Sequence, residues 1–234
     1  MSLAYRFALA LAALLAATSA RAVPTLQLDI LGGTYDSATQ TIIAPSASFT
    51  LYAYLQPETR SALTDRYFLS MALLPSTSIA GNYGSFTING SPVNVTSGMD
   101  YGTPPLESIL GGAATDPGDL SPHGIFPTYF YEKPFQFSPF NISGLYNTQT
   151  QTGIGPQAGS GMYYAAFNMN TAGITGYGLH FDLYNEKILT NGDIDVNQFA
   201  PFSHDAQVNV PEPNNLALLG LALLGFALAR RRSK

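Results

Sequence analysis

Apolar and polar residues alternate through most of the chain between Pro24 and Val210. The clearest example is residues 48–55, Ser-Phe-Thr-Leu-Tyr-Ala-Tyr-Leu, in which every second side chain from Phe49 onward is apolar. Successive side chains of a β-strand point to opposite faces, so alternation of this kind is typical of a strand with one buried face. The pattern predicts strands rather than helices.

Similar runs predict about eight strands, at residues 25–30, 48–55, 67–74, 85–88, 129–137, 162–168, 177–184 and 206–210. Twelve prolines between residues 45 and 156 would interrupt any long helix there. We therefore expect residues 23–209 to form a single all-β domain, an antiparallel β-sandwich of jelly-roll or immunoglobulin-like kind. Residues 98–127 and 141–161, which are rich in Gly, Pro and small polar residues, are predicted to be long surface loops.

Both ends of the chain differ from this body. Residues 1–6 carry one positive charge, residues 7–17 are an unbroken apolar run, and residues 18–22 end in an Ala-x-Ala pattern. This three-part order is typical of a secretory signal peptide and predicts cleavage after Ala22. Residues 1–22 are thus expected to direct export.

The C-terminal segment, residues 210–234, has three parts of its own. Val210, Pro211, Glu212 and Pro213 precede fourteen apolar residues at 216–229, which are followed by Arg230, Arg231 and Arg232. A helix of fourteen residues spans about 21 Å, less than the hydrocarbon thickness of about 30 Å. We therefore predict a short transmembrane helix that inserts transiently in the inner membrane, with the arginines on the cytoplasmic side.

The order of Pro-Glu-Pro, short apolar helix and terminal arginines resembles the PEP-CTERM sorting signal of Gram-negative bacteria. The resemblance implies an exosortase that recognises Pro211, Glu212 and Pro213 and removes the helix, with Arg230, Arg231 and Arg232 as the stop signal. It also implies an exported protein of the cell surface or extracellular matrix, with a biofilm or exopolysaccharide association. The alternative is an ordinary C-terminal anchor in which Pro-Glu-Pro is only a linker.

Four further segments, residues 24–30, 49–54, 121–130 and 199–205, are similar to the choice-of-anchor N proteins, which pair one exported domain with different C-terminal anchors. This resemblance implies no catalytic residue, because that group has no assigned activity.

Charge and cysteine content exclude several classes of function. Residues 23–209 contain 14 acidic and 4 basic residues, a net charge of −10, which disfavours nucleic acid and anionic lipid and is compatible with divalent cations. Cysteine is absent, so thiolate metal sites and cysteine nucleophiles are excluded. No nucleophile elbow, HExxH zinc motif or phosphate loop is present, and a non-enzymatic protein is the prediction.

The candidate chemical groups are few. His123, His180 and His204 could form a dispersed triad with a Ser or a carboxylate, which is the basis of a secreted-hydrolase alternative. His180 and Asp182 are two apart on a predicted strand, so they share the face opposite Leu179, Phe181 and Leu183 and could either bind a metal or hydrogen-bond. His123 follows a turn-rich segment in which Asp and His can serve turns and caps.

An acidic segment and an aromatic pair complete the candidates. Asp193, Asp195 and Asn197 place oxygen atoms at alternating positions, which predicts a calcium site or, otherwise, a solvated turn; the EF-hand glycine and terminal glutamate are missing. No other cofactor is predicted. Tyr52 and Tyr54 share a strand face, which suggests either core packing or, if both are exposed, a platform for carbohydrate binding.

Overall fold

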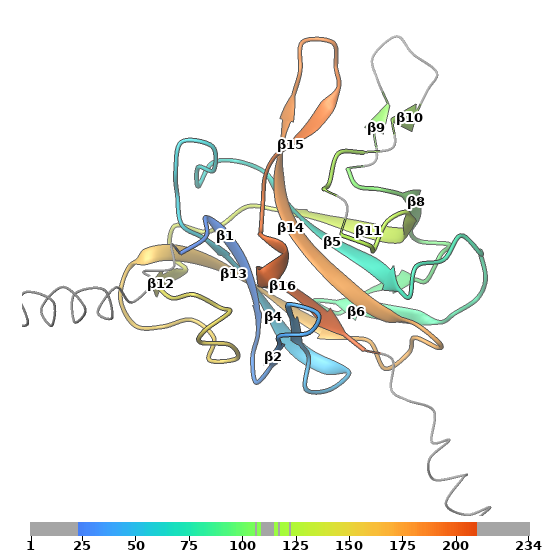
Figure 1. The fold of residues 1–234 in the computed structure, drawn as a ribbon, viewed down its shortest axis with the longest axis horizontal. Helices are drawn as coiled ribbons and strands as arrows, with labels where there is room; N and C mark the ends of the chain where they lie inside the picture. Colours follow the sequence, from blue (N-terminus) through green and yellow to red (C-terminus); the bar gives the residue numbers. More distant parts are fainter. Residues whose placement is uncertain (1–22, 106, 109–114, 117, 122, 210–234) are drawn as a thin grey trace, which may run out of the picture.

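The computed structural model describes residues 23–105, 107–108, 115–116, 118–121 and 123–209. Over these ranges the secondary structure is almost entirely β, and the strands form two large sheets and one two-stranded hairpin (Figure 1). The predicted signal peptide and the predicted sorting segment lie outside the described residues.

The first sheet has the order β1-β4-β13-β6-β7, with β12 pairing the other end of β13. Every pair in this sheet is antiparallel. Its strands are β1 (Leu26–Ile30), β4 (Ser48–Leu55), β6 (Ser85–Ile88), β7 (Ser91–Asn94), β12 (Ile142–Gly144) and β13 (Gly161–Asn170).

The second sheet has the order β2-β3-β16-β14-β5-β11-β8, and β15 pairs the far end of β14. Only the pair β3 and β16 is parallel. Its strands are β2 (Thr34–Asp36), β3 (Thr41–Ile43), β5 (Tyr67–Leu74), β8 (Asp100–Gly102), β11 (Thr128–Phe135), β14 (Gly178–Ile188), β15 (Ile194–Phe199) and β16 (Asp205–Val208). A separate hairpin joins β9 (Glu107–Ser108) to β10 (Thr115–Asp116), and the 3-10 turn η1 (Phe202–His204) leads into β16.

The two sheets pack face to face around one core. Apolar side chains of β1, β4 and β13 meet those of β5, β14 and β16. Phe49 of the first sheet and Phe181 of the second are in edge-to-face contact with ring centroids 5.9 Å apart. The predicted all-β sandwich is therefore confirmed, and all eight predicted strands coincide with observed ones to within a few residues.

Residues 145–157, in the second predicted loop, are held on the outer face of β1 by hydrogen bonds. Gln27 and Asp29 point away from the core but are fully buried, because this loop covers them. The Asp29 carboxylate accepts hydrogen bonds from the amides of Ile30 and Gly153, at 2.9 and 2.8 Å, and from the Tyr146 hydroxyl at 3.1 Å. The loop is therefore part of the folded domain.

Gly153 shows why this loop needs a glycine. Its φ is +82°, and a Cβ there would lie 2.5 Å from the carbonyl oxygen of Gly33. Only glycine adopts this conformation without strain while approaching another backbone so closely. The carbonyl of Gly153 also accepts a hydrogen bond from the amide of Gly32 at 2.9 Å, which ties the loop to the turn after β1.

The outer face of the second sheet is covered as well. Leu120 packs against Phe68 and Tyr184, and Phe126 and Phe199 lie beside them. The end of the first predicted loop therefore crosses β5 and β14 instead of extending into solvent. This cover explains why polar side chains on the outer face of β14 are buried.

In the part of the chain that the structure describes, no helix has the length and apolar character needed to cross a membrane.

Candidate functional site

His180 and Asp182 lie on the outer face of β14, as the alternation predicts. Leu179, Phe181 and Leu183 point into the core from the opposite face. His180 and Asp182 are nevertheless only 3% exposed each, and His123 of the covering segment lies against both. Two polar side chains are thus held in a mostly enclosed position between a sheet and its covering loop.

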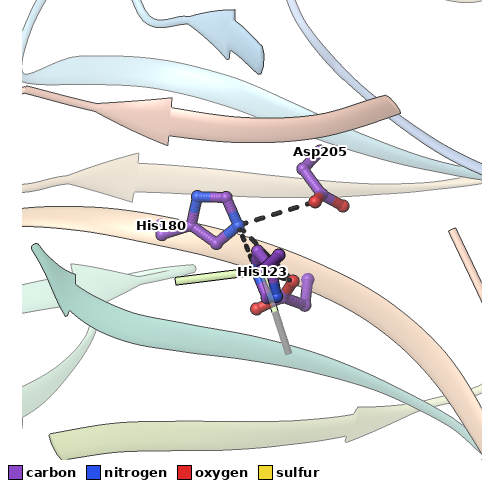
Figure 2. Close-up of side chains that lie close together, drawn as sticks. His123, His180 and Asp205 are labelled. Atoms are coloured by element: carbon purple, nitrogen blue, oxygen red, sulfur yellow. Dashed lines mark hydrogen bonds and ion pairs between the residues drawn. The ribbon is translucent and has the colours of Figure 1, made fainter. Parts of the chain in front are cut away.

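Two residues from distant parts of the sequence join them. In the antiparallel pairing of β14 with β16, His180 is opposite Gln207, which places Asp205 diagonally across from His180 on the same face. His123 reaches the same point from the covering segment (Figure 2). We call His123, His180, Asp182 and Asp205 the His–Asp cluster.

The ligand-type atoms of the cluster converge. The two histidine Nε2 atoms are 3.1 Å apart, and Oδ1 of Asp182 is 3.1 Å from Nε2 of His123 and 3.4 Å from Nε2 of His180. Oδ2 of Asp205 is 3.6 Å from Nε2 of His180. No two of the four ligand-type atoms are farther apart than 4.8 Å.

Burial and mutual charge shift the titration of these groups. Burial by itself lowers the pKa of His180, but the nearby carboxylates of Asp182 and Asp205 outweigh it and raise this pKa to about 10. Burial by itself raises the pKa of Asp182, but the two histidines outweigh it and lower this pKa to about 2. Burial raises the pKa of Asp205 to about 7. In the cluster without a bound ion, the carboxylates of Asp182 and Asp205 thus favour the protonated form of His180.

Several buried polar atoms of the cluster lack a hydrogen-bond partner among the described residues. They are Nδ1 of His180, Oδ2 of Asp182 and Oδ2 of Asp205. A cavity of about 430 Å³ adjoins the cluster and is lined by His123, His180 and Asp205 together with Phe202 and Gln207. The cluster is thus buried but reachable from this cavity.

His204, the third histidine, is not part of the cluster. One of its ring nitrogens is 2.9 Å from the Ser203 hydroxyl, and the other is 3.1 Å from Oδ1 of Asn147. This Ser-His-Asn chain has an amide where a serine-hydrolase triad has a carboxylate that stabilises the imidazolium. The contact instead joins η1 to the loop that covers β1. His123 and His180 meet the condition of lying beside a carboxylate at a cavity.

The predicted calcium residues lie on and before β15, away from the cluster. Oδ2 of Asp195 is 3.0 Å from Nζ of Lys187, and the Asn197 amide donates to the carbonyl of Arg60 at 2.7 Å. The backbone amide of Asp193 donates to the side chain of Asn191 at 3.1 Å. These contacts are those of a salt-bridged hairpin, and calcium binding by Asp193, Asp195 and Asn197 stays a prediction.

Tyr52 and Tyr54 do not form an exposed platform. Tyr54 is fully buried, packs edge-to-face on Tyr146 at 5.0 Å, and belongs to a small cluster with Met162. Tyr52 is partly buried beside Tyr164. The flat, solvent-facing pair that the carbohydrate-binding alternative requires is absent at these two tyrosines, because the loop containing Tyr146 covers that strand face.

Sequence reasoning missed Asp205 as a member of the cluster. The residue occurred in the segment 199–205, but nothing in its spacing to His180, 25 residues upstream, indicates a contact. The pairing of β16 with β14 creates the contact, and a strand order cannot be read from alternation alone.

Comparison with known proteins bears on the C-terminal segment. Residues 209–232 match the family model of the PEP-CTERM protein-sorting motif. The chain carries a PEP-CTERM sorting motif. This motif indicates an exported protein that is sorted to the cell surface, as Val210, Pro211, Glu212 and Pro213 predicted. These four residues and Arg230, Arg231 and Arg232 lie outside the described residues.

The comparisons add little about the domain that precedes the motif. Comparison with curated proteins gave no match. Among solved structures, the chain is similar to the collagen-binding subdomain of the Enterococcus faecalis surface protein ACE, at 10% identity, with 81% of this chain and 99% of that chain covered and a TM-score of 0.25. A TM-score this low supports no inference about ligand. The resemblance to the choice-of-anchor N proteins stays a prediction.

Proposed function

We propose that this protein is an exosortase substrate that is exported, held briefly in the inner membrane by residues 216–229, and transferred to the cell envelope or extracellular matrix. The observation that carries the proposal is the match of residues 209–232 to the PEP-CTERM sorting motif. In this account the enzyme recognises Pro211, Glu212 and Pro213, and the apolar segment is removed.

The role proposed for the β-sandwich is non-enzymatic: a structural component of the surface or matrix, in contact with exopolysaccharide. The net charge of −10 over residues 23–209 and the continuous apolar core between the two sheets support a soluble outer domain. An acidic β-sandwich of this kind suits a passive surface protein. The exopolysaccharide partner follows from the sorting family and not from any residue of the domain.

Surface delivery can be tested by labelling intact cells with a membrane-impermeant amine reagent, which reaches lysines of an exposed domain. We expect the wild-type protein to be labelled at Lys133 or Lys187, and a variant with Pro211→Ala, Glu212→Ala and Pro213→Ala to remain unlabelled in the inner-membrane fraction. The matched control is Pro57→Ala with Glu58→Ala, an exposed Pro-Glu pair inside the domain, which should be labelled like the wild type. Equal labelling of the motif variant and the wild type would contradict the proposal.

A further inference from the structure

We propose that the His–Asp cluster is a binding site for a divalent transition-metal ion of the Zn²⁺ type, held by Nε2 of His123, Nε2 of His180, a carboxylate oxygen of Asp182 and a carboxylate oxygen of Asp205. This site is independent of the proposed sorting function, because it lies wholly inside the β-sandwich.

The distances between the ligand atoms fit a small tetrahedral ion. Bonds of about 2.0–2.2 Å from zinc to nitrogen or oxygen give ligand-to-ligand separations of about 3.3–3.6 Å in a tetrahedron. The four close distances in the cluster are 3.1, 3.1, 3.4 and 3.6 Å. The remaining separations do not exceed 4.8 Å, so a shift of about 1 Å in the Asp205 carboxylate completes the tetrahedron.

The ligand types select the class of ion. Imidazole nitrogen favours zinc, copper, nickel and iron, whereas calcium and magnesium require six or more oxygen ligands. Two imidazoles and two carboxylates give a neutral site around a divalent ion if both histidines are uncharged. The cluster therefore suits zinc better than it suits the calcium ion predicted for Asp193, Asp195 and Asn197.

The surroundings of His123 orient it as a ligand. Its Nδ1 is 3.1 Å from the carbonyl oxygen of Ser121, which can only accept a hydrogen bond, so Nδ1 carries the proton and the lone pair of Nε2 faces the cluster. The imidazole also stacks on Phe202, with centroids 4.4 Å apart and an interplanar angle of 15°. These contacts fix the ring in the position that metal binding requires.

The carboxylates have unused binding capacity. Oδ2 of Asp205 is buried and too far from His180 for a hydrogen bond, and Oδ2 of Asp182 is buried without a partner. Buried polar atoms normally have a hydrogen-bond partner, because an unsatisfied one has lost its water without a replacement. A bound cation would supply this oxygen of Asp205 with a direct partner, in addition to its ion pair with His180 at 3.6 Å.

Four protein ligands leave no open position, which is typical of a structural and not a catalytic zinc site. The ion would link three segments distant in sequence: the covering segment through His123, β14 through His180 and Asp182, and the start of β16 through Asp205. Phe202 and Gln207 line the cavity through which the ion reaches the cluster. Metal binding would therefore hold the covering segment on the outer face of the second sheet.

The test uses the full chain without a polyhistidine tag, purified in mild detergent, treated with EDTA, dialysed and titrated with ZnCl₂. We expect one zinc per chain by inductively coupled plasma mass spectrometry. At a free zinc concentration of about 100 times Kd, the Tm should rise by about 5–10 °C. His123→Ala should lower the zinc affinity at least tenfold, and Asp205→Asn, which keeps the shape of the side chain, should also weaken binding.

The control variant carries Asp193→Asn and Asp195→Asn, which remove two carboxylates outside the cluster and should leave zinc binding unchanged. Circular dichroism of the metal-free variants shows whether they retain the β-sheet fold, so lost binding is not confused with unfolding. A wild-type chain with less than about 0.1 zinc at saturation, or a folded His123→Ala variant that binds zinc as tightly as the wild type, would overturn the proposal.

Discussion

Replacing Phe181 by alanine is expected to lower the free energy of unfolding by about 3–5 kcal/mol. Phe181 is fully buried in β14, and its ring centroid is 5.9 Å from that of Phe49 in the opposite sheet. Its removal leaves a cavity between two sheets whose backbones are fixed by their hydrogen bonds, so the walls can collapse only in part. Urea denaturation followed by circular dichroism measures the change.

Ile188→Ala is the matched control, because Ile188 lies at the end of the same strand and is 76% exposed. Its substitution should change the stability by less than about 0.5 kcal/mol. If Phe181→Ala lowers the free energy of unfolding no more than Ile188→Ala does, the two sheets do not share the core described above.

Asp29→Ala is expected to cost about 2–3 kcal/mol of stability, and to loosen the loop at residues 145–157. Without the carboxylate, the amides of Ile30 and Gly153 and the Tyr146 hydroxyl lose a buried acceptor, and an unsatisfied buried donor costs about 1–3 kcal/mol. Part of this loss is offset, because burial of the carboxylate is itself unfavourable. Denaturation and hydrogen exchange of the Gly153 amide measure the two effects.

Asp36→Ala removes an aspartate on the protein surface and should leave exchange at Gly153 unchanged. Protection of the Gly153 amide that survives Asp29→Ala would show that the loop is held by other contacts, such as the hydrogen bond from Gln27 to the carbonyl of Tyr146.

The same aspartate predicts a pH dependence. Burial is the largest cause that raises the pKa of Asp29 above its usual 3.8, and four hydrogen bonds lower it only in part. Between pH 3.8 and this raised pKa the folded state binds more protons than the unfolded state, so the contribution of Asp29 to stability falls as pH rises. The stability of the wild type relative to that of Asp29→Asn should therefore fall as pH rises through this window, and a rise would contradict a buried carboxylate with a raised pKa.

Alternation predicted the long strands because their two faces meet different surroundings. In β4 and β14, one face of the strand packs in the core and the other does not. Apolar residues therefore recur at every second position of these strands. Short strands such as β2, β3 and β12 contain only three residues each, too few for a period to be visible. No strand was predicted at β15, Ile-Asp-Val-Asn-Gln-Phe, because the alternating oxygen side chains of Asp193, Asp195 and Asn197 indicated a calcium site or a solvated turn.

The loops and the site were harder to predict for a different reason. Residues 145–157, 118–121 and 123–127 have the composition of surface loops, yet they cover buried groups such as Asp29 and His180. The composition of a segment indicates whether it tends to form a loop, a strand or a helix, but it does not indicate which residues the segment packs against. The shared face of His180 and Asp182 followed from strand geometry, whereas the approach of His123 and Asp205 depends on tertiary contacts that local patterns do not encode.

The central claim, that the C-terminal segment is a sorting signal removed on the way to the surface, is tested most directly by the intact mass of the protein recovered from its host. The account predicts a chain that starts after the signal peptide, near Val23, and ends close to Pro213, without residues 216–234. In the Pro211→Ala, Glu212→Ala, Pro213→Ala variant the C-terminal residues should remain. A wild-type protein that still ends at Lys234 in the membrane fraction would contradict the account and make the segment a plain membrane anchor.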